Sequence, residues 1–212
     1  MILDYNKIIP NSLINLFEKG IINIHFSKLP RYRGPSPVQQ TILDGKTEAW
    51  ISYFLISKEL DTGDILFQSS ERIEPNENTE SLYLKLTEKA SGETTQVVKE
   101  YLLGKITPKP QKGKPSYTKK FRLEDCKIDW KIPDEYLERL VRACSPEPGA
   151  WTMVELGTMN NEPRTKRLKI LQAHLENNNL ILDLVQLEGK KPVTWKQFKE
   201  GYPEMKILNS KS

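Results

Sequence analysis

The sequence predicts an α/β domain in its first half and a small antiparallel β domain in its second half. In residues 1–103, short apolar runs alternate with amphipathic stretches, a pattern typical of strands and helices packed in layers. In residues 119–212, several β-rich runs surround a single amphipathic stretch. Three prolines and two glycines within residues 104–116 exclude regular structure there, so we expect a linker at residues 104–118.

Hydrophobic periodicity and turn residues define the elements of the first half. Because strands and helices alternate, we expect a layered, partial doubly wound (Rossmann-like) domain. Only Met1-Ile-Leu3 precedes the first loop, so we expect that the opening part of such a domain is missing. The predicted helices span about residues 11–19, 37–44 and 79–103, and the predicted strands span about residues 21–25, 49–56 and 65–73.

The second half has the pattern of a small barrel. Asn-rich turns separate its β-rich runs, and several short strands around one helix are typical of an OB-like fold. We expect a helix at about residues 133–144, β-rich runs at 150–156, 167–175 and 180–187, and a short final helix near 195–200.

Composition narrows the class of protein. Hydrophobic residues make up 37% and charged residues 28%, values typical of globular chains. No apolar run approaches the ~20 residues that a membrane span needs, and charges interrupt the first twenty residues. The two cysteines, Cys126 and Cys144, lack the spacing of a zinc or redox motif. We therefore expect reduced thiols, a cytoplasmic location and no membrane partner.

The net charge of +4 is unevenly distributed. Residues 1–103 carry 11 Lys/Arg against 14 Asp/Glu, whereas residues 104–212 carry 21 against 14. The second half is therefore basic, which indicates either a polyanionic partner or a solvated surface without a ligand.

Asn23 and His25 form the first candidate site. They lie two residues apart at the end of the predicted strand 21–25, so their side chains point to the same face. Ligands of open α/β sheets bind just beyond the carboxyl ends of strands. An amide can donate to an oxyanion and an imidazole can move a proton, although a strand-capping Asn and a structural His are the alternatives.

The loop Leu60-Asp61-Thr-Gly63-Asp64 is the second candidate. Gly63 permits a sharp turn, and a carboxylate from Asp61 would orient the imidazole of His25 if it reached that ring. An ordinary Asp-rich turn or a cation loop is the alternative. Asp64 stands before the next strand and suits a structural role.

Together these residues resemble the folate-dependent formyltransferase family. The resemblance rests on Asn23-x-His25-x-Ser27-x-Leu29-Pro30-x-Tyr32-Arg33-Gly34, on Pro37 and on Leu60-Asp61-Thr-Gly63-Asp64-Ile65. It continues in Tyr5-Asn6-Lys7-Ile8-Ile9-Pro10, Ile128-Asp-Trp130, Leu137-x-x-x-Val141-Arg-Ala143 and Pro148-Gly-Ala-Trp-Thr152. The sequence departs from the family pattern at Asp4, Asn6, Phe26 and Lys28.

The resemblance implies transfer of a formyl group from 10-formyltetrahydrofolate to the α-amino group of methionyl initiator tRNA, without a metal. Asn23, His25 and Asp61 match the catalytic triad of the family. The folate-binding residues that the resemblance implies are Tyr5, Asn6, Lys7, Ile8, Ile9, Ser27, Leu29, Pro30, Leu60, Gly63 and Asp64.

The resemblance also implies a tRNA-binding role for the basic second half. Alternatives are a sugar N-formyltransferase and a tRNA-binding remnant that does no chemistry. Because the family has further strands before the first strand of this chain, we expect either a truncated product or a separately encoded N-terminal segment. The basic residues that would meet phosphates are Lys105, Lys109, Lys112, Lys114, Lys119, Lys120, Arg122, Arg164, Lys166, Arg167 and Lys169.

Overall fold

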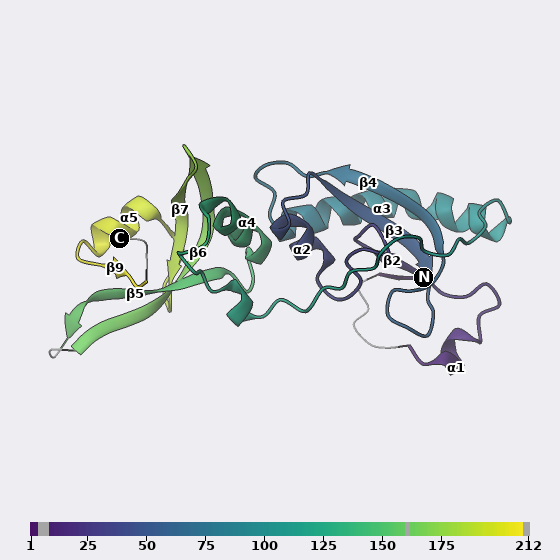
Figure 1. Ribbon diagram of the computed structural model, residues 1–212, viewed down its shortest axis with the longest axis horizontal. Coiled ribbons are helices and arrows are strands. Elements are labelled where there is room, and N and C mark those ends of the chain that lie inside the picture. The colour runs from purple at the N-terminus through teal and green to yellow at the C-terminus, as the bar shows by residue number, and fades with distance from the viewer. Residues whose placement is uncertain (4–8, 160–161, 210–212) are drawn as a thin grey trace. The chain divides into compact units, whose positions relative to one another are not determined.

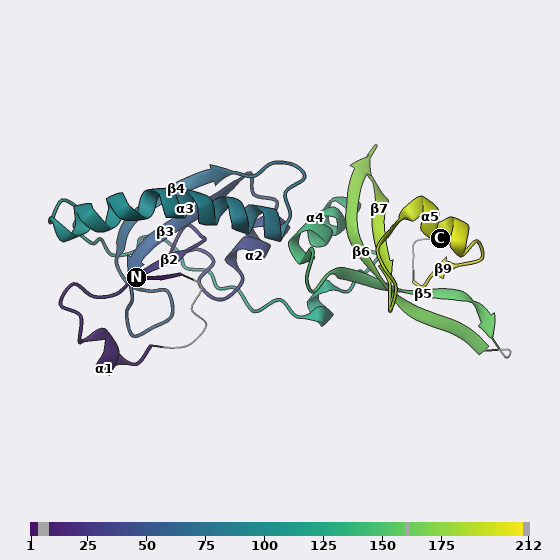
Figure 2. The same cartoon turned by 180° about the vertical axis from the view of Figure 1, so that it is seen from behind.

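The computed structural model describes residues 1–3, 9–159 and 162–209, and its chain divides into two compact units (Figures 1 and 2). The first unit comprises Met1–Glu77 with Ser81–Lys120, and the second comprises Asn78–Glu80 with Phe121–Ser212. The segment expected to be a linker falls within the first unit.

A mixed four-stranded sheet forms the core of the first unit. Its order is β1 (Ile2–Leu3), β2 (Ile22–His25), β3 (Glu48–Leu55) and β4 (Ile65–Arg72). Strands β1 and β2 are parallel, whereas β2, β3 and β4 are antiparallel. The predicted α/β class is confirmed.

Helix α3 (Thr79–Leu102) covers one face of this sheet (Figures 1 and 2). Its apolar side buries Leu82, Leu86, Ala90 and Val97. Tyr53 on β3 donates a hydrogen bond of 2.9 Å to the carbonyl of Ala90, and burial raises the pKa of this tyrosine to about 12. The long predicted helix therefore anchors the sheet.

The other two helices of this unit, α1 (Asn11–Ile14) and α2 (Pro37–Leu43), are short. The helix expected over 11–19 ends at Ile14 instead. Leu16 and Phe17 are 76% and 52% exposed, so no packed apolar face supports further helical turns.

The second unit is an antiparallel sheet with two α-helices and a short 3-10 helix. Its strands are β5 (Ala150–Met159), β6 (Glu162–Glu176), β7 (Asn179–Leu187), β8 (Val193–Thr194) and β9 (Lys206–Ile207). Their order is β8-β7-β6-β5-β9, and within the described ranges β8 and β9 are not paired, so the sheet is open. The predicted small antiparallel β domain is confirmed, and its sheet is open within the described ranges. Helices η1 (Leu123–Cys126), α4 (Asp134–Cys144) and α5 (Trp195–Gly201) complete the unit.

The expectation of two reduced thiols is wrong. Cys126 and Cys144 form a disulfide, and both are fully buried. Packing brings the end of η1 to the end of α4, with 6.1 Å between the two Cα atoms, which is within the range of a disulfide. Among the residues that the structure describes, no helix is long and apolar enough to cross a membrane.

Candidate active site

Strand β2 places Asn23 and His25 on one side of its carboxyl end, as their spacing predicts. His25 is only 8% exposed, and its Nε2 lies 2.8 Å from the carbonyl oxygen of Tyr32. Because a carbonyl only accepts, Nε2 carries the proton of this hydrogen bond. Asn23 keeps a buried Oδ1 that has no hydrogen-bond partner within the described residues.

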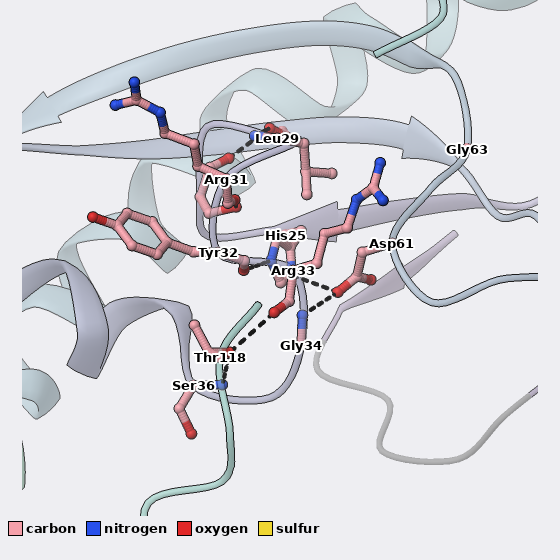
Figure 3. Close-up of polar contacts among 12 residues, drawn as sticks. His25, Leu29, Arg31, Tyr32, Arg33, Gly34, Ser36, Asp61, Gly63 and Thr118 are labelled. Atoms are coloured by element: carbon pink, nitrogen blue, oxygen red, sulfur yellow. Dashed lines mark hydrogen bonds and ion pairs between the residues drawn. The ribbon is translucent and has the colours of Figure 1, made fainter. Parts of the chain in front are cut away.

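Asp61 reaches the imidazole from the loop between β3 and β4 (Figure 3). Its Oδ2 lies 3.8 Å from Nδ1 of His25, and both side chains are nearly buried. The backbone N–H of Gly34 donates to the same Oδ2 over 2.7 Å, which fixes the carboxylate. The structure therefore brings Asp61 to His25, and Asn23 lies on the same side of β2 as His25.

The shape of this loop depends on Gly63. A Cβ at this position would lie 1.6 Å from the backbone oxygen of Leu55, far inside van der Waals contact. Asp61 itself has a positive φ of 52°, which is uncommon outside glycine. The backbone carbonyl of Asp64 accepts from the N–H of Leu55, and the role of the Asp64 side chain stays a prediction.

Several of the expected folate-binding residues lie inside the loop that follows β2. The hydroxyl of Ser27 is fully buried and donates to the carbonyl of Arg31 over 2.7 Å. Leu29 is also buried, and its N–H donates to Ser52. Pro30 accepts a backbone hydrogen bond from Ser116. These contacts show how the loop is held.

Of the remaining expected folate-binding residues, the structure describes Ile9 and Leu60. Ile9 lines an apolar cavity of about 290 Å³ beside β1, whereas Leu60 is 61% exposed at the tip of the Asp61 loop. Tyr5, Asn6, Lys7 and Ile8 lie outside the described residues. Contact with folate stays a prediction for the whole set.

Sequence analysis missed the part that residues 104–118 play in the site. Gln111 donates to the carbonyls of Asp61 and Gly63 over 2.8 and 2.9 Å. Arg33 in turn donates to the side-chain oxygen of Gln111 over 2.6 Å. The segment thus supports the Asp61 loop. An amide within a Lys/Pro-rich stretch is the only sequence signal, and it does not point to these partners.

The chemistry of the three side chains is complementary. An amide can stabilise negative charge on an oxygen, and an imidazole held by a carboxylate can accept and release a proton. Such an arrangement suits acyl transfer to an amine.

Family models match both parts of the chain. A formyl transferase model matches residues 1–98, and a model of the formyl transferase C-terminal domain matches residues 120–180.

Curated relatives agree with these models. The methionyl-tRNA formyltransferase of Thermodesulfovibrio yellowstonii is 30% identical over 222 residues, which cover 95% of this chain and 69% of that protein. The protein of the same name from Corynebacterium aurimucosum is 35% identical over 153 residues. That match covers 72% of this chain and 46% of the relative, so the matched region is about half of that protein's length.

Solved structures share the fold. The methionyl-tRNA formyltransferase from Clostridium thermocellum has a TM-score of 0.62 at 22% identity, covering 86% of this chain and 74% of that one. WlaRD, a sugar 3N-formyl transferase, has a TM-score of 0.67 at 21% identity, covering 99% of this chain and 72% of that one. With models of both of its domains and a 30% identical relative matching nearly all of its length, the chain belongs to the formyl transferase family.

Proposed function

We propose that this chain transfers a formyl group from 10-formyltetrahydrofolate to the α-amino group of methionyl initiator tRNA. The observation that carries the proposal is the contact between His25 and Asp61 in a formyl transferase, with the unpartnered Asn23 on the same side of β2. Curated relatives named methionyl-tRNA formyltransferase favour this acceptor.

The site suits a formyl group. Asn23 has a buried amide oxygen without a partner, and rotation of the amide exchanges its oxygen and NH₂ positions. Asn23 can therefore donate to an oxygen that develops negative charge. When bound, 10-formyltetrahydrofolate supplies the formyl carbon that the amine attacks.

In this proposal His25 transfers the proton and Asp61 stabilises the protonated imidazole. Donation from Nε2 to Tyr32 leaves Nδ1 as the basic nitrogen of the neutral ring. Nδ1 faces Asp61, so the carboxylate stabilises the ring once Nδ1 accepts the proton from the attacking amine. His25 then returns the proton to the leaving nitrogen of the folate, and no covalent enzyme intermediate is needed.

A formylation assay tests the function. The purified chain is incubated with 10-formyltetrahydrofolate and methionyl initiator tRNA, and formylmethionyl-tRNA is measured. A parallel reaction offers a nucleotide-linked amino sugar. Formylation of the sugar alone would identify a sugar N-formyltransferase, and tRNA binding without transfer would identify a non-catalytic remnant. Either result would contradict the proposal.

We further propose that residues 119–212 bind tRNA together with the basic residues of 104–118. If about five phosphates are contacted, tRNA affinity should fall at least ~100-fold between about 50 and about 200 mM salt, because bound counterions are released. Filter binding across this range measures the effect. An affinity that does not change with salt would contradict the proposal.

Not every basic residue in this region is equally available. Lys169 forms an ion pair with Glu147, and the guanidinium of Arg167 stacks 5.0 Å from the centre of the Trp151 ring. We therefore expect Lys112 and Lys114, which are exposed, to contribute more to the salt dependence than Arg167.

A further inference from the structure

A second cavity, lined largely by polar residues, lies beside the loop that follows His25. Its volume is about 160 Å³, and it is lined by the loop after β2, by α2 with the turn that follows it, and by the start of β3. One water needs only about 10–15 Å³ of such space, so a much larger group fits. Of its lining residues, Tyr32 enters the proposed mechanism only through its backbone carbonyl, and Ser27 is among the residues expected to bind folate.

Three cations line the cavity and only one carboxylate does. Lys28, Arg31 and Lys46 are exposed, and none of them forms an ion pair within the described part of the chain. Glu48 is the single acidic residue of the lining. The nearby Asp44 already accepts a hydrogen bond from Tyr32. The excess of positive charge suits an anion.

Trp50 positions one of these cations without neutralising it. The ammonium of Lys28 lies 3.6 Å from the centre of the Trp50 ring, a cation–π contact. A carboxylate partner would cancel the charge, whereas the neutral ring does not. Lys28 therefore keeps its positive charge for a ligand in the cavity.

Short turns fix the backbone at all three basic residues. The N–H of Arg31 donates to the carbonyl of Lys28 over 2.9 Å, and Ser27 binds the carbonyl of Arg31. Lys46 donates from its backbone to Thr41 at the end of α2, next to Gly45 with its φ of 64°. The backbone of the site is therefore preorganised, which lowers part of the entropic cost of binding.

The cavity and the candidate active site share one loop. The carbonyl of Tyr32 accepts the hydrogen bond from His25, while the side chains of Arg31 and Tyr32 line the cavity. In Figure 3 these two side chains point away from Asp61. A ligand in the cavity would thus lie beside the candidate active site without occupying it.

We propose that this cavity binds a backbone phosphate near the 3′ end of the RNA substrate. The inference rests on the proposed function, because the reacting amine of an aminoacyl-tRNA is attached at that end and its phosphates follow closely. A cluster of Lys and Arg beside an aromatic ring is typical chemistry for a nucleic-acid phosphate.

Removal of two charges tests the phosphate contact. The double variant Lys28→Gln/Lys46→Gln should bind methionyl initiator tRNA roughly tenfold more weakly than the unmodified chain. The slope of log affinity against log salt should fall in magnitude by about 1. The control Lys19→Gln/Lys99→Gln removes two exposed charges elsewhere in the same unit, and its affinity should change less than about twofold. Equal losses in both double variants would overturn the proposal.

Chemical substitution in the RNA locates the contact. Neutral methylphosphonates replace the phosphates near the 3′ end of an acceptor-stem RNA one at a time. One replacement should weaken binding to the unmodified chain but not weaken binding to Lys28→Gln/Lys46→Gln any further, because the contact is already lost. Additive losses at every position would overturn the proposal.

Binding of a free nucleotide distinguishes a site for an RNA phosphate from a site for a nucleotide phosphate. If thymidine diphosphate binds the unmodified chain but not the double variant, while RNA affinity is equal in both, the RNA assignment is wrong. Absence of any tRNA binding by the unmodified chain would instead refute the tRNA part of the proposed function. Weaker RNA binding by the double variant alone supports the phosphate site.

Discussion

Replacing His25 by Asn is expected to lower kcat for formyl transfer by about 10³-fold, because the site loses its proton acceptor. The Tyr32 carbonyl and the Asp61 carboxylate would remain in place, held by backbone contacts such as that of Gly34. Single-turnover formylation of methionyl-tRNA with saturating folate measures the effect.

The other histidine of the chain provides the matched control. His174 is exposed on β6 and is paired with Asp183, whose hydrogen bond raises the pKa of this histidine. His174→Asn should leave the rate of transfer within about twofold of the unmodified chain, as is usual for a surface change. Equal rates for His25→Asn and the unmodified chain would show that His25 does not act in the reaction.

Gly63→Ala is expected to lower the free energy of unfolding by about 3 kcal/mol and to reduce formyl transfer with it. The new Cβ would lie 1.6 Å from the oxygen of Leu55, and this oxygen belongs to rigid strand backbone. The loop must therefore move. Asp61, two residues before Gly63 in the sequence, moves with it.

Gly92→Ala is the control for this substitution. Gly92 lies within α3, and a Cβ there would meet nothing within 4 Å. Because alanine favours a helix more than glycine does, this variant should be more stable by up to ~1 kcal/mol. Chemical denaturation of both variants measures the difference. A Gly63→Ala chain as stable as the unmodified one would refute the close approach of residue 63 to the backbone of Leu55.

The sequence predicted those parts of the site that depend on local periodicity. Asn23 and His25 share a face because strand side chains alternate, and that follows from their spacing alone. The position of Asp61 depended on the family pattern, since helix α2 and strand β3 separate its loop from His25 along the chain. The structure adds the N–H of Gly34 and the amide of Gln111, which hold the loop through contacts that no spacing rule predicts.

Two expectations failed because tertiary packing decided them. The disulfide between Cys126 and Cys144 joins elements that the sequence does not show to be neighbours. The helix expected over 11–19 has the right periodicity, but the structure leaves Leu16 and Phe17 exposed. Periodicity identifies an apolar face but not whether another element covers it.

A double-mutant cycle between His25 and Asp61 tests the convergence of the site most directly. Single-turnover rates of formyl transfer are measured for the unmodified chain, His25→Asn, Asp61→Asn and the double variant. If Asp61 acts through the imidazole, Asp61→Asn should slow the unmodified chain strongly but slow the His25→Asn chain hardly at all. If the fold-reduction in rate of the double variant equals the product of the two single-variant reductions, the two residues act independently. That result would contradict the proposed mechanism.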